Sequence, residues 1–172
     1  MKIVVFADIH GSVSGMETAA QIAAIEKAQK VVFCGDLFGR WASNEQIARI
    51  AQSVDGVLYF VRGNNDGLDE RLIDGGMEDN VLMYHFGRKL FFTHGDRYNG
   101  WLVPPVLEQG DAVIFGHTHV GSLTVRNGLF ALNVGSVARP RDGVASYLVL
   151  DEQGATLCKL NGERLYFLPW NE

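Results

Sequence analysis

Two histidines follow one apolar segment of the sequence. The run DAVIFGHTHV, residues 111–120, places His117 and His119 one residue apart, directly after strand-forming residues. Residues i and i+2 of an extended chain project to the same side, so both imidazoles can face one point. Neutral imidazole is a ligand for transition metals such as zinc, manganese, iron and nickel. The pair therefore indicates a metal site, provided that other parts of the chain supply further ligands.

Four other apolar runs end in the same way: KIVVFADIH, KVVFCGD, GVLYFVRGNND and RKLFFTHGD. Together the five endings carry seven candidate metal ligands: Asp8, His10, Asp36, Asn64, His94, His117 and His119. Asp, Asn and Gly form turns wherever strands stop, which explains any single ending. Histidine is not a favoured turn residue, yet four of the five histidines lie at these ends. Only His85 does not, and we expect it to be an ordinary strand residue.

Seven ligands exceed the four that a tetrahedral zinc ion takes, and they suit two metal ions that share a bridging carboxylate. The mixture of carboxylate, carboxamide and imidazole donors favours manganese, iron or zinc over copper or calcium. The sequence therefore predicts a binuclear centre.

The elements that must position these side chains can also be read from the sequence. The five runs are continuously rather than alternately apolar, which predicts strands covered on both faces. Residues 12–30 and 41–53 have helical patterns, and Ser43 and Gln46 in the second have capping-box spacing. Functional residues in such α/β proteins gather beyond the carboxyl ends of the strands.

The second half of the chain reads as strand, turn, strand. SLTVR and LFALNVGS flank Asn127-Gly128, a strong hairpin signal, and ASYLVLD, ATLCKL and RLYFL continue the pattern. We expect an α/β (α+β) fold in a single domain spanning residues 1–172, a length that can bury a sizeable core.

The composition and net charge argue against some classes of function. The apolar content of 47% is that of a globular protein, and the formal charge of −5 argues against binding long nucleic acids or acidic lipid. Cys34 and Cys158 form no CxxC pattern and are expected to be reduced core thiols. With no signal-peptide pattern and no apolar stretch long enough to span a membrane, we expect a cytoplasmic protein.

The ordered series DxH, GD, GNxD, HG and GHTH resembles the calcineurin-like metallophosphoesterase superfamily. Within it, the length and the NVGSVARPR and ASYLVLD segments resemble small phosphodiesterases of the YfcE and MJ0936 type. The resemblance implies a four-layer αββα sandwich holding two divalent metal ions. We expect these ions to be Mn²⁺, with Fe, Zn and Ni as alternatives. It also implies that Asp8, His10 and His119 hold one ion, that Asn64, His94 and His117 hold the other, and that Asp36 bridges both.

Four further residues are candidates for contact with substrate or for support of the site. Asn65 stands where much of the superfamily has a histidine that contacts phosphate, so we expect it to donate a hydrogen bond to phosphate but not to act as an acid. Asp66 either orients a loop or ligand beside the metals or caps a helix. Arg139 and Arg141 either approach the substrate phosphate or lie in a solvated loop.

The expected activity is hydrolysis of a small phosphodiester by a metal-activated hydroxide. One alternative is a phosphomonoesterase or nucleotidase on the same centre. Another is a metal-binding scaffold, because a retromer subunit of similar fold is mainly a scaffold. We expect a homo-oligomer from the resemblance to related proteins.

Overall fold

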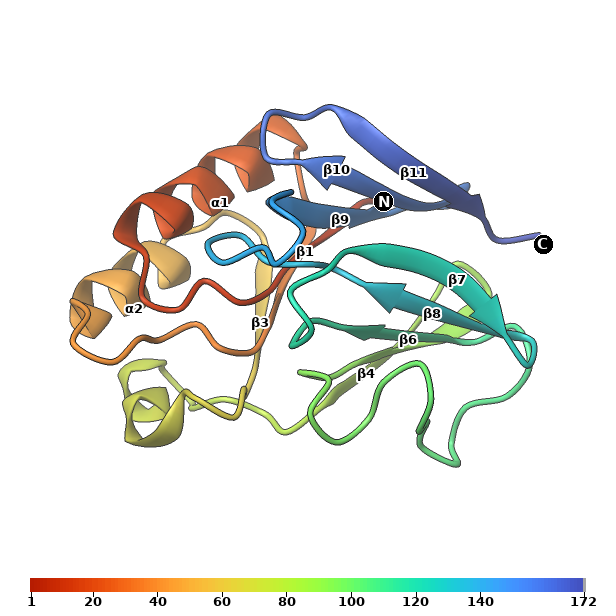
Figure 1. The fold of residues 1–172 in the computed structure, drawn as a ribbon, viewed down its shortest axis with the longest axis horizontal. Coiled ribbons are helices and arrows are strands. Elements are labelled where there is room, and N and C mark those ends of the chain that lie inside the picture. Colours follow the sequence, from red (N-terminus) through yellow and green to blue (C-terminus); the bar gives the residue numbers. More distant parts are fainter. Residues whose placement is uncertain (172) are drawn as a thin grey trace.

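Two β-sheets pack face to face in the computed structural model, which describes residues 1–171 of the chain (Figure 1). The first sheet has six strands in the order β11-β10-β9-β1-β2-β3, formed by Arg164–Pro169, Gly154–Lys159, Ser146–Leu150, Ile3–Phe6, Lys30–Cys34 and Val57–Val61. The second has five in the order β4-β5-β6-β8-β7, formed by Val81–His85, Arg88–Phe92, Ala112–Phe115, Leu129–Asn133 and Ser122–Arg126. The predicted two-sheet α/β fold is confirmed.

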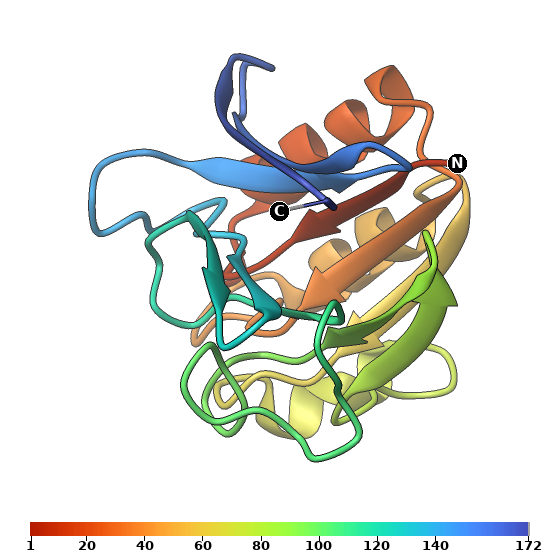
Figure 2. The same cartoon turned by 90° about the vertical axis from the view of Figure 1, so that its right-hand side faces the viewer.

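Helices cover the outer face of the first sheet (Figure 2). They are α1 (Val13–Ile25) and α2 (Asn44–Gln52), and a short 3-10 helix, η1 (Gly67–Leu72), follows β3. The outer face of the second sheet is covered by the loop of residues 93–111, whose Leu107 packs on Phe91 and Phe115. Within residues 1–171 this fourth layer therefore contains no helix.

The central strands are buried on both faces, as their continuous hydrophobicity predicts. In β1, Val4 and Phe6 pack toward the helices, while Ile3 and Val5 belong to the core between the sheets. Both predicted helices are present, but the Ser43 side chain makes no capping hydrogen bond at the start of α2. The predicted hairpin is confirmed between β7 and β8.

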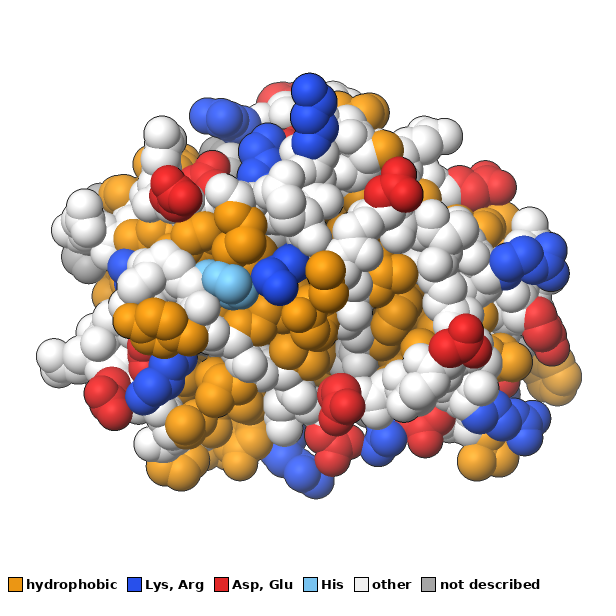
Figure 3. Space-filling view, turned by 180° about the vertical axis from the view of Figure 1, so that it is seen from behind, with side chains coloured by type: hydrophobic (Ala, Val, Ile, Leu, Met, Phe, Trp, Pro, Cys, Tyr) orange, Lys and Arg blue, Asp and Glu red, His pale blue; other side chains and the backbone are white. Residues whose placement is uncertain are grey.

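Edge strands expose apolar side chains. β3 and β4 stand at the ends of their sheets and expose Val57, Leu82 and Tyr84. The view from behind shows clusters of hydrophobic side chains among scattered charges (Figure 3). None of the helices in residues 1–171 combines the length and apolar character needed to cross a membrane.

Strand direction determines where the polar endings lie. β1, β2 and β3 run parallel to one another in the first sheet, as do β5, β6 and β8 in the second. The carboxyl ends of parallel strands share one edge, so the segments that follow them can meet there.

Candidate metal centre

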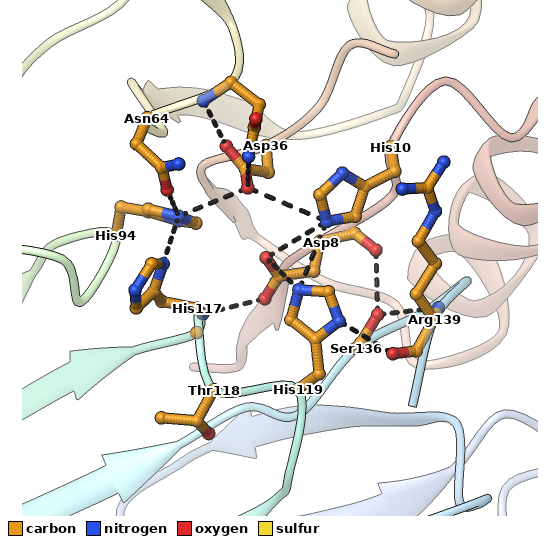
Figure 4. A network of polar contacts seen from close by, with 12 residues as sticks. Asp8, His10, Asp36, Asn64, His94, His117, Thr118, His119, Ser136 and Arg139 are labelled. Carbon is orange, nitrogen blue, oxygen red and sulfur yellow. Dashed lines mark hydrogen bonds and ion pairs between the residues drawn. The ribbon is translucent and has the colours of Figure 1, made fainter. Parts of the chain in front are cut away.

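All seven candidate ligands come together at this edge (Figure 4). Asp8 and His10 follow β1, and Asp36 follows β2. Asn64 follows β3, His94 follows β5, and His117 and His119 follow β6. The two sheets thus contribute ligand-type side chains to one cluster.

One group within the cluster is formed by Asp8, His10 and His119. The Oδ1 atom of Asp8 lies 3.6 Å from His10 Nε2 and 3.2 Å from His119 Nε2. These two imidazole nitrogens are 3.2 Å apart. Three donor atoms therefore converge on one point.

A second group surrounds His94. Its Nε2 atom lies 2.9 Å from Asn64 Oδ1, 3.1 Å from His117 Nδ1 and 3.4 Å from Asp36 Oδ2. Asp36 Oδ2 is also 3.6 Å from His10 Nε2 in the first group. Asp36 thus faces both groups at once.

Asp8 carries a polar atom that lacks a partner. Its Oδ2 atom accepts a hydrogen bond of 2.8 Å from the His117 backbone N–H. Its Oδ1 atom is fully buried and has no hydrogen-bond partner in the described chain. An unpaired buried carboxylate oxygen is costly, and a bound cation would satisfy it. The donor set therefore fits a divalent metal ion.

Two histidines have their tautomer fixed by carbonyl groups. The Nδ1 atoms of His94 and His119 lie 3.0 Å from the Cys34 carbonyl oxygen and 2.7 Å from that of Arg139. A carbonyl only accepts, so Nδ1 carries the proton and donates it in both cases. When the ring is neutral, Nε2 presents its lone pair to the cluster, as a metal ligand must.

Contacts within the cluster shift the pKa values of Asp36 and His94. Burial would raise the pKa of Asp36, but hydrogen bonds from His94 and Asn65 and the charge of His94 hold it well below its usual range. Burial would lower the pKa of His94, but its hydrogen bond to Asp36 and the charge of Asp36 raise it to about 9. In the metal-free protein His94 therefore holds a proton at neutral pH, in the place that a cation would take.

Backbone strain is concentrated in these segments. Five candidate ligands have a left-handed backbone: Asp8 (φ 56°), His10 (φ 49°), Asp36 (φ 52°), His117 (φ 66°) and His119 (φ 63°). This conformation is uncommon for residues other than glycine and is often found at functional sites. Neighbouring glycines allow close packing, because a Cβ on Gly116 would lie 2.6 Å from Asp8 Oδ2. The sequence showed the glycines before Asp36, Asn64 and His117 but not why they are needed.

Asp66 is buried against the loops that carry Asp36 and Asn64. Its carboxylate accepts hydrogen bonds from the backbone N–H groups of Asp36 (3.0 Å), Gly63 (2.7 Å) and Phe38 (3.0 Å). It makes no capping bond to η1, so of the two interpretations of Asp66 the geometry favours loop orientation. Burial raises its pKa to about 6 against the opposing effect of the N–H donors.

Asn65 also forms hydrogen bonds with Asp36. Its backbone N–H donates to Asp36 Oδ1 and its side-chain amide to Asp36 Oδ2, both at 2.8 Å. One amide hydrogen remains for another acceptor. Asn65 is exposed on a cavity of about 440 Å³ that His10, Arg40 and Arg139 also line.

The two candidate arginines differ in position. The Arg139 side chain lines the cavity beside His10, and its carbonyl accepts from His119 (Figure 4). Arg141 only donates its backbone N–H to the His119 carbonyl, and its exposed side chain does not line that cavity. Sequence reasoning missed Ser136, whose hydroxyl donates to the Asp8 carbonyl at 2.9 Å and accepts from the Arg139 N–H.

Residues 1–155 match the family model of the calcineurin-like phosphoesterase superfamily domain. The chain belongs to the calcineurin-like phosphoesterase superfamily. Membership places it among phosphoester hydrolases, as the sequence predicted, and the family implies divalent metal ions.

Two relatives in this superfamily match most of the chain. Phosphodiesterase YfcE of Escherichia coli strain K12 is 31% identical over 178 residues, covering 96% of this chain and 95% of YfcE. Phosphodiesterase MJ0936 of Methanocaldococcus jannaschii is 26% identical over 163 residues, covering 89% of this chain and 94% of MJ0936.

Solved structures share the fold of this chain. The structure of YfcE, a phosphoesterase from E. coli, matches with a TM-score of 0.91 at 27% identity, covering 99% of this chain and 100% of that one. Vps29 from Entamoeba histolytica, solved with Zn²⁺, matches with a TM-score of 0.66 at 17% identity, covering 99% and 100%, and shares the fold.

Proposed function

We propose that this protein is a binuclear metal-dependent phosphodiesterase. The observation that carries the proposal is the position of Asp36 Oδ2, which lies between His10 Nε2 (3.6 Å) and His94 Nε2 (3.4 Å). A carboxylate between two groups of imidazoles suits a site in which two cations share one ligand. The names of the relatives YfcE and MJ0936 support a diester as substrate.

The ligands divide between the two positions. We assign Asp8, His10 and His119 to one ion and Asn64, His94 and His117 to the other, with Asp36 bridging. The mixture of oxygen and imidazole donors suits manganese, iron or zinc better than copper or calcium. Of these we propose Mn²⁺, with iron, zinc and nickel as alternatives.

When bound, the two cations would supply positive charge, which lowers the pKa of water so that hydroxide is available as the nucleophile. The same charge would neutralise negative charge on the phosphate. The residues of the chain position the other participants. Asn65 holds Asp36 and directs its remaining amide hydrogen to a phosphate oxygen. Arg139 and Arg40 line the adjoining cavity, where their charges attract the phosphate, and Arg141 is a weaker candidate for this role.

The test is hydrolysis of bis(p-nitrophenyl) phosphate by metal-free protein to which Mn²⁺ or another single metal is added back. We expect turnover only with metal, and about two metal ions per chain by elemental analysis. Asp36→Asn keeps the shape of the side chain but removes its charge, so both activity and metal content should fall. If Asp36→Asn retains both, Asp36 is not the bridging ligand.

A parallel assay with p-nitrophenyl phosphate compares the diester with the monoester. Faster monoester hydrolysis would favour the phosphomonoesterase alternative. Bound metal without turnover of either ester would favour the scaffold alternative. We further propose a cytoplasmic location, a small diester rather than a nucleic-acid polymer as substrate, and assembly into a homo-oligomer.

A further inference from the structure

A second cavity, of about 430 Å³, opens on the other sheet beside the candidate metal centre. Its lining includes His117 and Thr118 next to the metal centre, Phe115 from β6, Arg126 from β7 and Trp101 from the loop of residues 93–111. We name it the Trp101 cavity. Its volume lies within the range of roughly 300–1,000 Å³ that is typical of small-molecule sites.

The Trp101 side chain is exposed to solvent rather than buried. It is 82% exposed, although an indole ring is usually buried when it serves only for packing. The Arg126 guanidinium carbon lies 3.4 Å from the centre of the Trp101 ring. This cation–π contact holds the ring beside the cavity while much of its surface remains available.

Asn99 fixes the loop that presents Trp101. Its side-chain oxygen accepts from the backbone N–H groups of Trp101 (2.8 Å) and Leu102 (3.2 Å). Its side-chain nitrogen donates to the carbonyl of Gly95, the residue directly after His94. The position of Trp101 is thereby linked to the segment that carries a candidate metal ligand.

A second part of the cavity lining is also fixed by an asparagine side chain. The Asn133 side-chain nitrogen donates to Thr118 Oγ1 (2.8 Å) and to the Gly116 carbonyl (3.1 Å). Two segments of the cavity lining are therefore braced by hydrogen bonds from asparagine side chains, and the buried Phe115 also lines the cavity.

We infer that the Trp101 cavity binds a planar heteroaromatic group, such as a nucleobase, attached to the phosphate at the metal centre. The indole and guanidinium offer flat surfaces for stacking, which suits any base. Asp96, Ser122 and Thr124 add polar groups for the edges of a base. This inference rests on the proposed diesterase function, since it identifies one substituent of the substrate.

The test compares adenosine 5′-monophosphate with ribose 5-phosphate, which has the same phosphate and sugar but a hydroxyl group in place of the base. Calorimetry measures the dissociation constant of each with the Mn²⁺-loaded protein. We expect the nucleotide to bind about tenfold more tightly, as stacking of a base on an aromatic side chain implies. Equal affinities for the two probes would overturn the inference.

Three variants test whether Trp101 causes the preference for the nucleotide. Trp101→Ala should reduce the nucleotide preference to less than about twofold, while Trp101→Phe, which keeps a flat ring, should retain it. Trp41→Ala is the matched control, because Trp41 is also exposed and lies near an arginine, Arg40, but lines neither cavity. It should leave the preference unchanged. A preference that survives in Trp101→Ala would overturn the assignment.

Binding and turnover are measured separately, so the two proposals fail separately. Absence of diester hydrolysis with every metal would reject the proposed activity, while the binding comparison still tests the cavity. Hydrolysis without any preference for the nucleotide would reject only the inference about the Trp101 cavity.

Discussion

The carboxylate of Asp66 accepts a hydrogen bond of 3.0 Å from the backbone N–H of Asp36. The same carboxylate accepts from Gly63 and Phe38, so a single buried side chain satisfies three N–H groups around the β2 and β3 endings. Asp66 thus holds the backbone of Asp36, the residue that we propose to bridge the two metal ions.

Asp66→Asn is expected to disturb both the loop and the metal site. An amide nitrogen cannot accept, so at least one of the three N–H groups loses its acceptor, at a cost of about 1–3 kcal/mol. Urea unfolding of the metal-free variant should show this loss in the free energy of unfolding. Its Mn²⁺ affinity should fall about 10–100-fold in a calorimetric titration. The control is Asp55→Asn, at an exposed position, and an equal effect in both variants would contradict the role of Asp66.

Metal binding should release a proton from His94. The pKa of His94 is raised to about 9 in the metal-free protein, whereas a metal ligand must be neutral. Apparent Mn²⁺ affinity should therefore increase with pH from 6 to about 9, by up to about tenfold per unit. Calorimetric titrations with Mn²⁺ at pH 7, in buffers of different ionisation enthalpy, should show that about one proton is released on binding. A heat that is independent of the buffer would contradict this expectation.

The stability of the metal-free protein should depend on pH in the same region. The pKa of His94 in the folded protein, about 9, exceeds its ordinary value of 6.5. The stabilisation of the folded state by protonated His94 is therefore complete below pH 6.5 and is lost as the pH rises through 9. Urea unfolding in chelator should show lower stability at pH 9 than at pH 6.5. His94→Gln removes the titrating group, so this variant should lose less between the two pH values. An equal loss in both proteins would assign the dependence to other groups.

Much of the site could be predicted because its signals are local. Each apolar run ends at a polar residue, and parallel strands place their carboxyl ends together, so Asp8, Asp36 and His94 could be grouped from the sequence. The metal roles of these residues remain predictions.

Other features depend on contacts that leave no local pattern. The role of Asp66 depends on hydrogen bonds across about thirty positions of the chain, to Asp36 and Phe38. The loop of residues 93–111 has no helical or strand periodicity, so neither its covering of the second sheet nor the position of Trp101 could be derived. The expected capping hydrogen bond of Ser43 is absent, and at this helix start the Asn44 side chain binds the N–H and the carbonyl of Gly39, which the local sequence pattern does not predict.

Asn65→His should change which esters are hydrolysed efficiently. An amide cannot deliver a proton to a leaving group, whereas an imidazole at this exposed position could, since Asn65 lines the cavity beside His10. With Mn²⁺ present, the ratio of kcat/KM for a diester with an alkyl leaving group to that for a p-nitrophenyl diester should increase at least about tenfold. Asn65→Gln keeps an amide and serves as the control. Because the p-nitrophenolate group leaves without a proton, an equal change for both substrates would mean that the residue acts through Asp36 rather than as an acid.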